Sequence, residues 1–211
     1  MIVIACVDAG NYLGRGVAYV TELYRAVCAQ MNVPFSFHCF TDRIEADYPA
    51  GVVRRALPVG VSGWYNKLYL FADGVFSDYQ RVIFFDLDTI IVGPLDEIAA
   101  YKGEFAMLRD LTMPSRKASG VMAWRGGVHS SIWSEWVADG KPKMPMGDQE
   151  YIEQHMVGER VDCLQDIVKG IYSYKVSCKK ALPKDATIVC FHGKPRPHEV
   201  KHDWIKSTYG T

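Results

Sequence analysis

Apolar and polar positions follow two different periods along the chain, and together they predict an α/β fold. Short continuous apolar runs bounded by loop residues are typical of buried strands, and they occur at residues 2–7, 35–40 and 81–85. Apolar residues spaced by three or four between the first two runs predict a helix over 17–31. Further strands are expected at 52–57, 90–92, 105–108, 121–124 and 186–191, and further helices at 64–71, 130–138 and 148–156. Alternating strands and helices favour a single domain over 1–211 with a central mixed, mainly parallel sheet.

Two segments carry more local predictions. The segment 64–71 is expected to pack Trp64, Leu68 and Phe71 against the core and to expose Lys67 on another face. The stretch from about 194 to 211 is polar and broken by prolines, so it is expected to lie on the surface as a short tail.

Charge and composition narrow the class of protein. The 211 residues include 24 basic and 24 acidic side chains, and this balance disfavours a nucleic-acid binder that neutralises phosphates. The six cysteines include no Cys-x-x-Cys pair, which favours reduced thiols over a disulfide framework or zinc site. The sequence starts without the pattern of a signal peptide, and no apolar run reaches the ~20 residues of a transmembrane segment. We therefore expect a cytoplasmic protein.

Two carboxylates follow the most apolar predicted strand. Asp86 and Asp88 come directly after it, and ligands of open α/β sheets bind beyond the carboxyl ends of strands. Acids two positions apart face the same side of a continuing strand, and such a pair is costly unless a cation neutralises it. Their hard oxygens suit magnesium or manganese. The alternative is that one acid caps a turn and the other is solvated.

Two later clusters add polar groups. His192 follows the last predicted strand, with Gly193 and Lys194 behind it. An imidazole can complete a metal site, a glycine lets backbone approach a phosphate, and a lysine offsets its charge. A packed or surface histidine is the alternative. Asp148 and Gln149 lie at a predicted helix start, where plain N-terminal capping by Asp148 is the alternative.

These segments match a family signature in order along most of the chain. The run Asp-Leu-Asp-Thr at 86–89, with Gly-Pro-Leu at 93–95, is followed by an Asp-Gln pair and a His-Gly-Lys-Pro run. The other matching segments are 4–8 with 11–12, 67–68 and 119–122. The pattern resembles glycosyltransferase family 8, the group of glycogenin and the bacterial lipopolysaccharide galactosyltransferases, and it implies the type A glycosyltransferase fold.

The resemblance implies a transferase that moves a hexose from a UDP-sugar to a carbohydrate or glycolipid acceptor, with retention of configuration. Mn²⁺ or Mg²⁺ would bridge the donor diphosphate and stabilise the leaving UDP. Its ligands would be Asp86, Asp88 and His192. Contacts to the uridine would come from Asp8, Asn11, Tyr12 and the backbone of Leu87. Contacts to phosphate or sugar oxygens would come from Lys67, Gly193 and Lys194, and contacts at the donor sugar from Asp148 and Gln149.

Two motifs depart from the family pattern. Ala118 stands where the family has an asparagine that contacts the donor sugar, and Ser119 is a possible substitute. Gly193 and Lys194 follow His192 directly instead of standing three and six residues later, which weakens their assignment as phosphate contacts.

Two other functions fit part of the pattern. In a haloacid dehalogenase-like phosphatase, Asp86 would be the nucleophile and Asp88 the acid/base, with Asp162 and Asp166 as downstream magnesium ligands. That motif usually has a glycine before its threonine, whereas Thr89 follows the second aspartate directly. A degenerate nucleotide-sugar-binding domain is the other alternative.

Three tryptophans are candidates for an acceptor surface. They are Trp124, Trp133 and Trp136. The helical spacing of the last two favours packing instead.

Overall fold

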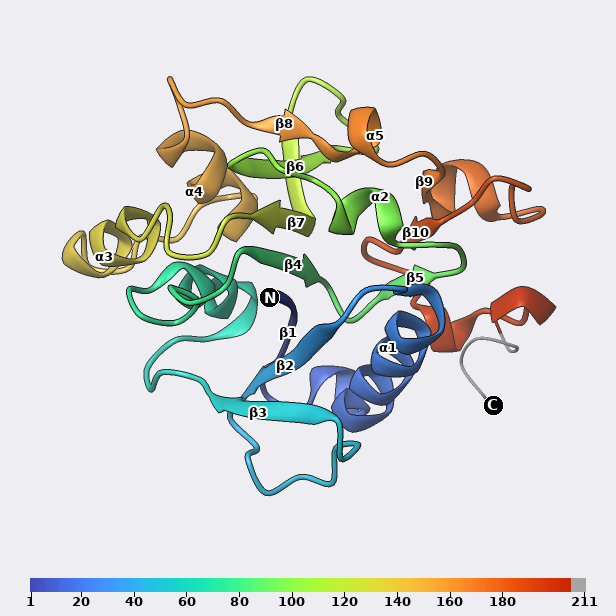
Figure 1. Cartoon of the computed structure of the whole chain (residues 1–211), viewed down its shortest axis with the longest axis horizontal. Helices are drawn as coiled ribbons and strands as arrows, with labels where there is room; N and C mark the ends of the chain where they lie inside the picture. Colours follow the sequence, from blue (N-terminus) through green and yellow to red (C-terminus); the bar gives the residue numbers. More distant parts are fainter. Residues whose placement is uncertain (206–211) are drawn as a thin grey trace.

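The computed structural model describes residues 1–205 and contains two β-sheets (Figure 1). The large sheet has the strand order β3-β2-β1-β4-β7-β6-β8 and the small one β5-β10-β9. The strands are β1 (Ile2–Asp8), β2 (Phe35–Thr41), β3 (Val52–Ala56), β4 (Arg81–Phe85), β5 (Thr89–Ile91), β6 (Phe105–Arg109), β7 (Lys117–Trp124), β8 (Asp162–Cys163), β9 (Ile171–Ser173) and β10 (Ile188–Cys190). The α-helices are α1 (Gly16–Gln30), α2 (Asp96–Ala99), α3 (Ser131–Ala138), α4 (Asp148–His155) and α5 (Leu164–Ile167). The other helical turns are η1 (Tyr12–Gly14), η2 (Gly63–Phe71), η3 (Tyr174–Cys178) and η4 (Pro197–Glu199).

The large sheet is mixed, as predicted. Strands β3, β2, β1 and β4 run parallel, whereas β7 is antiparallel to both β4 and β6. In β1, Ile4 and Cys6 pack on the same side as α1, while Val3 and Ala5 pack on the side of η2, α3 and α4. Cores on both faces explain why the central strands are continuous apolar runs.

The central mixed sheet is confirmed, and two of the predicted strands lie outside it. The predicted strands at 90–92 and 186–191 form β5 and β10, which pair antiparallel in the small sheet with β9 beside them. The chain leaves the large sheet after β4, and Figure 1 shows β5, β9 and β10 beyond one end of it. The short strands β8 and β9 were not predicted, because two or three residues carry no detectable period.

The prediction for residues 64–71 is reversed at two positions. The segment is a 3₁₀ helix, in which residues three apart lie on one face. Tyr65, Leu68, Leu70 and Phe71 pack in the core, and Asn66 is buried as well. Lys67 is 7% exposed rather than exposed, and Trp64 is 61% exposed rather than packed.

The segment after 194 is not a surface tail over the residues that the structure describes. Pro197 is buried, and Ile205 is 2% exposed in a small core with Ile90 and Tyr174. Residues 206–211 of the predicted tail lie outside the described part.

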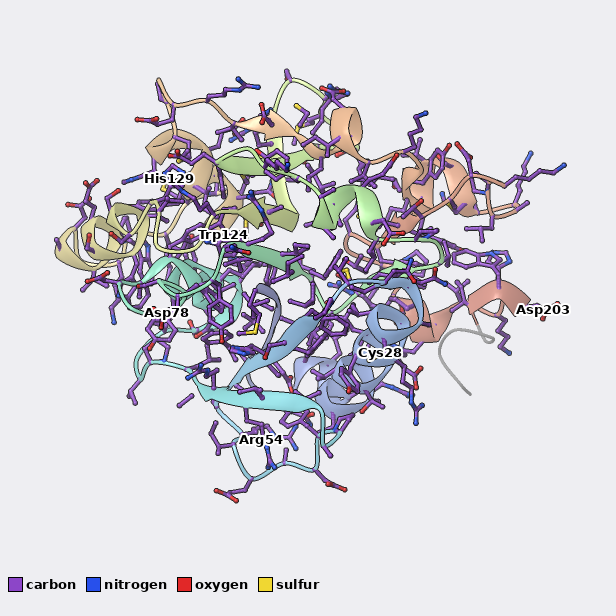
Figure 2. All side chains as sticks on the ribbon, in the orientation of Figure 1. Cys28, Arg54, Asp78, Trp124, His129 and Asp203 are labelled. Atoms are coloured by element: carbon purple, nitrogen blue, oxygen red, sulfur yellow. The ribbon has the colours of Figure 1, made fainter. Side chains whose placement is uncertain are left out.

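The three predicted tryptophans do not form an acceptor surface. Trp124 lies in the interior, in contrast to Arg54 on the edge strand β3 (Figure 2). Trp136 is buried and stacks on Tyr65, and Trp133 packs edge-on against Tyr69. Over residues 1–205, no helix combines the length and the apolar character that crossing a membrane requires. A cytoplasmic location stays a prediction.

Candidate functional site

The Asp-Leu-Asp run links the two sheets at the carboxyl end of β4. The Asp86 backbone N–H donates to the carbonyl of Gly120 on β7, at 2.8 Å, and β5 begins three residues later at Thr89. Leu87 is 2% exposed and packs in the core on the α1 side. The buried leucine therefore anchors the turn, and the fold brings Asp86 and Asp88 to the edge where ligands of such sheets bind.

Lys67 lies at the centre of a buried polar cluster. Its Nζ is 3.1 Å from Asp86 Oδ1 and 3.2 Å from Asp148 Oδ2, and it donates to Ser119 Oγ at 3.0 Å. The Ser119 hydroxyl donates to Asp148 Oδ2 at 2.6 Å. One cation thus joins the carboxylate that follows β4 to the carboxylate that starts α4. Ser119, the substitute considered for the family's asparagine at position 118, belongs to the same cluster.

Asp148 does not cap its helix with its side chain. Gly147 is the N-cap of α4, and no side chain makes a capping hydrogen bond there. The Asp148 side chain is buried and paired with Lys67 and Ser119, so the capping alternative does not account for it. Gln149 follows on the first turn and is half-buried.

Burial decides the charge state of this cluster. Desolvation raises the pKa of Asp86 to about 7. The attraction of Lys67 acts against this rise, and repulsion from Asp88 and Asp148 adds to it. Burial alone would lower the pKa of Lys67, but the attraction of Asp148 and Asp86 outweighs it and raises that pKa. The lysine therefore stays charged while the surrounding negative charge is only partly compensated.

Asp88 faces a different cation, which the sequence analysis did not identify. Its Oδ2 accepts a hydrogen bond from the Tyr12 hydroxyl at 3.0 Å and another from Arg196 Nη1. Arg196 Nη1 also donates to the Tyr12 hydroxyl at 2.8 Å. Burial raises the pKa of Asp88, although Arg196 and Tyr12 act against that rise. The sequence signal for Arg196 was the second basic-proline pair, two residues after the first.

Asp8 and Asn11 hold the loop that carries Tyr12. Asp8 is fully buried, and its carboxylate accepts the Tyr12 backbone N–H at 2.8 Å and the Tyr48 hydroxyl at 2.6 Å. A Cβ at Gly16 would lie about 2 Å from that carboxylate, so only glycine fits there. Asn11 has a left-handed backbone and accepts the Gly16 N–H at 3.0 Å. In this structure both predicted uridine contacts order the loop.

The predicted metal ligands are not gathered into one group. His192 Nε2 hydrogen-bonds Ser173 Oγ at 2.7 Å, and burial together with the charge of Lys175 lowers the pKa of His192. Among residues 1–205, no three His, Cys, Asp or Glu side chains are arranged to hold a metal ion. Metal binding by Asp86, Asp88 and His192 stays a prediction.

The two glycine and lysine candidates behind the histidine are exposed. Gly193 has a φ of 67°, a conformation that favours glycine, and Lys194 follows it in solvent. Neither joins the clusters around Asp86 and Asp88 through a hydrogen bond that the structure shows.

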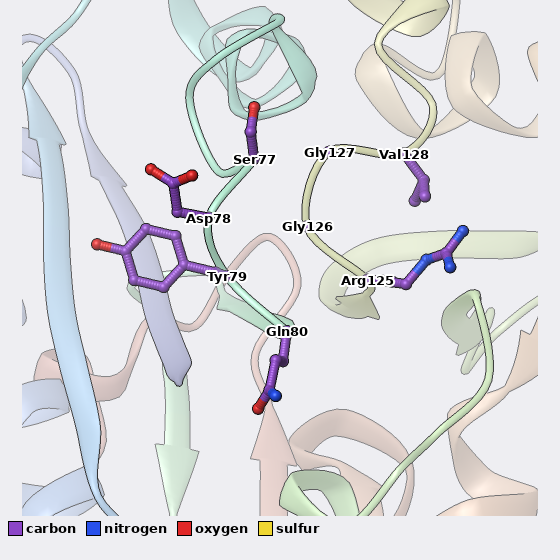
Figure 3. A pocket seen from close by; sticks show the side chains of 8 residues that line it. All are labelled: Ser77, Asp78, Tyr79, Gln80, Arg125, Gly126, Gly127 and Val128. Atoms are coloured by element: carbon purple, nitrogen blue, oxygen red, sulfur yellow. The ribbon is translucent and has the colours of Figure 1, made fainter.

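Two hollows open at opposite ends of the large sheet. The larger, of about 500 Å³, lies at the amino end of β4 between residues 77–80 and 125–128, and contains none of the predicted site residues (Figure 3). The smaller, of about 180 Å³, lies beyond the carboxyl ends of β1 and β2 and is lined by Gly10, Asp42, Asn66 and others. The smaller hollow lies at the edge of the sheet where ligands of such folds bind, and its lining residue Asn66 directly precedes Lys67 in the chain, so we assign the hollow to the candidate site.

Similarity to known proteins is structural. No family model and no curated protein matches the sequence. The galactosyltransferase LgtC, solved with donor and acceptor sugar analogs, matches with a TM-score of 0.67 and 14% identity over 99% of this chain and 95% of that one. A structure of an LgtC active-site variant, with glutamine replaced by glutamate, matches with a TM-score of 0.68 and 13% identity over 99% and 94%.

Two larger proteins share the fold. The glycosyltransferase GlyE of Streptococcus pneumoniae TIGR4 matches with a TM-score of 0.71 and 13% identity, over 100% of this chain and 60% of GlyE. The bifunctional glycosyltransferase WbbM matches with a TM-score of 0.68 and 13% identity, over 100% of this chain and 49% of WbbM. The chain thus spans little more than half of GlyE and about half of WbbM. The predicted glycosyltransferase fold is confirmed.

Proposed function

We propose that this chain is a glycosyltransferase that moves a hexose from a UDP-sugar to a carbohydrate or glycolipid acceptor. The proposal rests on Asp86 and Asp148 paired with Lys67 and on the neighbouring Asp88 held by Arg196, at the carboxyl end of β4, in a fold shared with glycosyltransferases. The adjoining hollow is narrow and partly apolar, which suits a planar base. A nucleotide with its base in the hollow would place its phosphates near the Asp-Leu-Asp turn.

A divalent cation suits the carboxylate pair. Asp86 and Asp88 offer hard oxygen ligands, and the pKa of Asp86 is raised mainly by burial, with repulsion from Asp88 and Asp148 adding to the rise. Mn²⁺ or Mg²⁺ bound there would act as a Lewis acid toward the leaving UDP. His192 has a lowered pKa, hence the neutral ring that metals bind, but it would exchange its bond to Ser173 for the metal.

Basic side chains of this chain would then meet the diphosphate. Arg196 is partly exposed and forms hydrogen bonds with Asp88 and Tyr12. A rotation about its side-chain bonds would turn the guanidinium toward phosphate oxygens without a movement of any helix or strand. Lys67 keeps Asp86 and Asp148 at fixed positions, which orients both carboxylates before the donor arrives. Gly193 and Lys194 are exposed near this segment and stay candidates for phosphate contacts.

Asp148 and Gln149 are proposed to act at the donor sugar. The Asp148 carboxylate is locked by Lys67 and Ser119, so it can orient a sugar hydroxyl. The Gln149 amide, on the same helix start, can stabilise charge that develops near the anomeric carbon. LgtC has a glutamine in its active site, which supports this assignment. Retention of configuration is proposed from the family resemblance.

The phosphatase alternative lacks its downstream acids. Asp162 accepts hydrogen bonds from Tyr101 and Arg160, and Asp166 is 63% exposed in an ion pair with Arg109. Neither acid takes part in the clusters around Asp86, so the structure favours the transferase.

The decisive experiment is a panel of UDP-sugars with Mn²⁺, scored for UDP release and for UDP binding by calorimetry. We expect binding and turnover, with the UDP affinity falling at least about tenfold, roughly 1.4 kcal/mol, when EDTA removes the metal. Equal affinity with and without metal would contradict the metal bridge. Binding without turnover on any donor would favour the degenerate domain, and hydrolysis of p-nitrophenyl phosphate without UDP binding would favour the phosphatase.

A further inference from the structure

An exposed tryptophan stands at the rim of the candidate site. Trp64 is 61% exposed, although a tryptophan usually buries most of its surface. It belongs to η2, and residues three apart in a 3₁₀ helix share a face. Trp64 therefore lies on the face of Lys67, which is 7% exposed and paired with Asp86 and Asp148. A buried charged residue, Lys67, and an exposed aromatic residue, Trp64, are thus neighbours on η2.

The indole lies against the residue before Asp148. A Cβ at Gly147 would lie 2.7 Å from Trp64 Nε1 and 3.0 Å from its two neighbouring ring carbons, so the Gly147 backbone packs against the face of the pyrrole ring at Nε1. Gly147 has a φ of 75°, which favours glycine, and it is the N-cap of α4. The close approach places the indole one residue from the carboxylate proposed to meet the donor sugar.

The position of Trp64 is fixed from beneath. The neighbouring Tyr65 hydroxyl donates to the Met144 carbonyl and accepts from the Met144 N–H, at 3.3 and 2.5 Å. The Tyr65 ring stacks on Trp136, with centroids 5.5 Å apart and an interplanar angle of 10°. The segments around Trp64 and Gly147 are thereby joined, and an exposed aromatic ring on a rigid base is pre-organised for binding.

The small hollow lies beside η2. Its lining includes Ser62, Gly63 and Asn66 but not Trp64, together with Gly10 and Asp42 from the β1 and β2 ends. Trp64 follows Gly63 of the hollow in the chain and lies against Gly147, the residue before Asp148. A nucleotide-sugar whose base fills the hollow leaves the indole for what approaches from solvent.

We propose that Trp64 is the acceptor subsite, and that its indole stacks on a pyranose ring of a saccharide acceptor. This inference rests on the proposed function. A pyranose has one apolar C–H face and a belt of hydroxyls, so it matches an aromatic face beside buried polar groups. The acceptor hydroxyl would then lie next to the sugar held by Asp148.

The test separates acceptor binding from donor binding. We expect Trp64→Ala to raise the acceptor KM about tenfold while the UDP affinity stays within about twofold of the wild type. Trp64→Phe should keep an acceptor KM close to that of the wild type, because phenylalanine retains an aromatic face. Lactose, maltose and cellobiose, titrated with UDP and Mn²⁺ present, should change the tryptophan fluorescence of the wild type. The signal should vanish in Trp64→Phe and persist in the control Trp133→Phe.

Failure of the inference is distinct from failure of the proposed function. An unchanged acceptor KM in Trp64→Ala, or weakened UDP affinity instead, would overturn the acceptor subsite while leaving a transferase. No UDP binding by the wild type would overturn the proposed function. In that case the fluorescence titration still decides whether saccharides meet Trp64, and no saccharide-dependent change attributable to Trp64 would overturn the subsite as well.

Discussion

Replacing Asp86 with asparagine should stabilise the metal-free protein at neutral pH, because the site disfavours this charge. Burial, with repulsion from Asp88 and Asp148, raises the pKa of Asp86 from 3.8 to about 7 in spite of Lys67. A folded-state pKa above the unfolded one means that the folded protein binds the proton more tightly. The free energy of unfolding therefore falls as the pH rises from about 4 to about 7, and asparagine removes that loss.

The size of the gain follows from the pKa. A difference of about three pKa units corresponds to about 4 kcal/mol for a group shielded from water, and screening by solvent lowers this limit because the Asp86 side chain is 33% exposed. The asparagine amide still has to be buried and no longer forms an ion pair with Lys67, so we expect about 2 kcal/mol. For a chain of this length the Tm should rise by about 4–8 °C at pH 8.

Calorimetric or urea unfolding in EDTA, run from pH 4 to pH 8, measures this gain. Near pH 4 the folded wild type already carries a proton on Asp86, so the difference between the two proteins should disappear there. Asp166→Asn, at a side chain that is 63% exposed, is the matched control and should show little change at either pH. A loss of stability in Asp86→Asn at pH 8, or a gain that does not depend on pH, would refute the reasoning.

Four further variants test the other parts of the site. Arg196→Gln should weaken UDP binding about tenfold by calorimetry, and unchanged affinity would remove Arg196 from the nucleotide site. Asp88→Asn should abolish transfer at low Mn²⁺ with an intact fold by circular dichroism, whereas wild-type turnover would remove Asp88 from the metal site. Asp148→Asn and Gln149→Ala should each lower the transfer rate at least about tenfold with UDP affinity nearly unchanged, and wild-type transfer in both would make this segment scaffold.

The strands and the Asp-Leu-Asp turn were predictable because they depend on local patterns. A short apolar run such as 81–85 is stable as a central strand of a sheet that is covered on both faces, and the acids that follow it then lie at the end of that strand. The sheet membership of 186–191 was not predictable, because pairing with β5 depends on where the chain turns after Asp88. Over nine residues, a period of three is hard to distinguish in a sequence from the 3.6-residue period of an α-helix. The exposure of Trp64 and the burial of Lys67 could therefore not be predicted from the pattern.

The site residues divide in the same way. Lys67, Asp86 and Asp148 were identified from motifs, and the structure brings them within hydrogen-bonding distance. The partnership of Arg196 with Tyr12 depends on a contact between residues 184 positions apart, which no local spacing reports. The alternative for Asp148 as a helix cap could be set aside only when its side chain was seen to face Lys67.

The contact between Tyr12 and Arg196 also sets the time at which the site can exist during synthesis. At 5–20 residues per second, the 184 positions between them take roughly 10–40 s to translate. The parallel strands β1, β2 and β4 are complete long before that, with Asp88 still without its arginine partner. Asp88 and Tyr12 therefore acquire their arginine partner only in the last stage of synthesis, after Arg196 has been added to the chain.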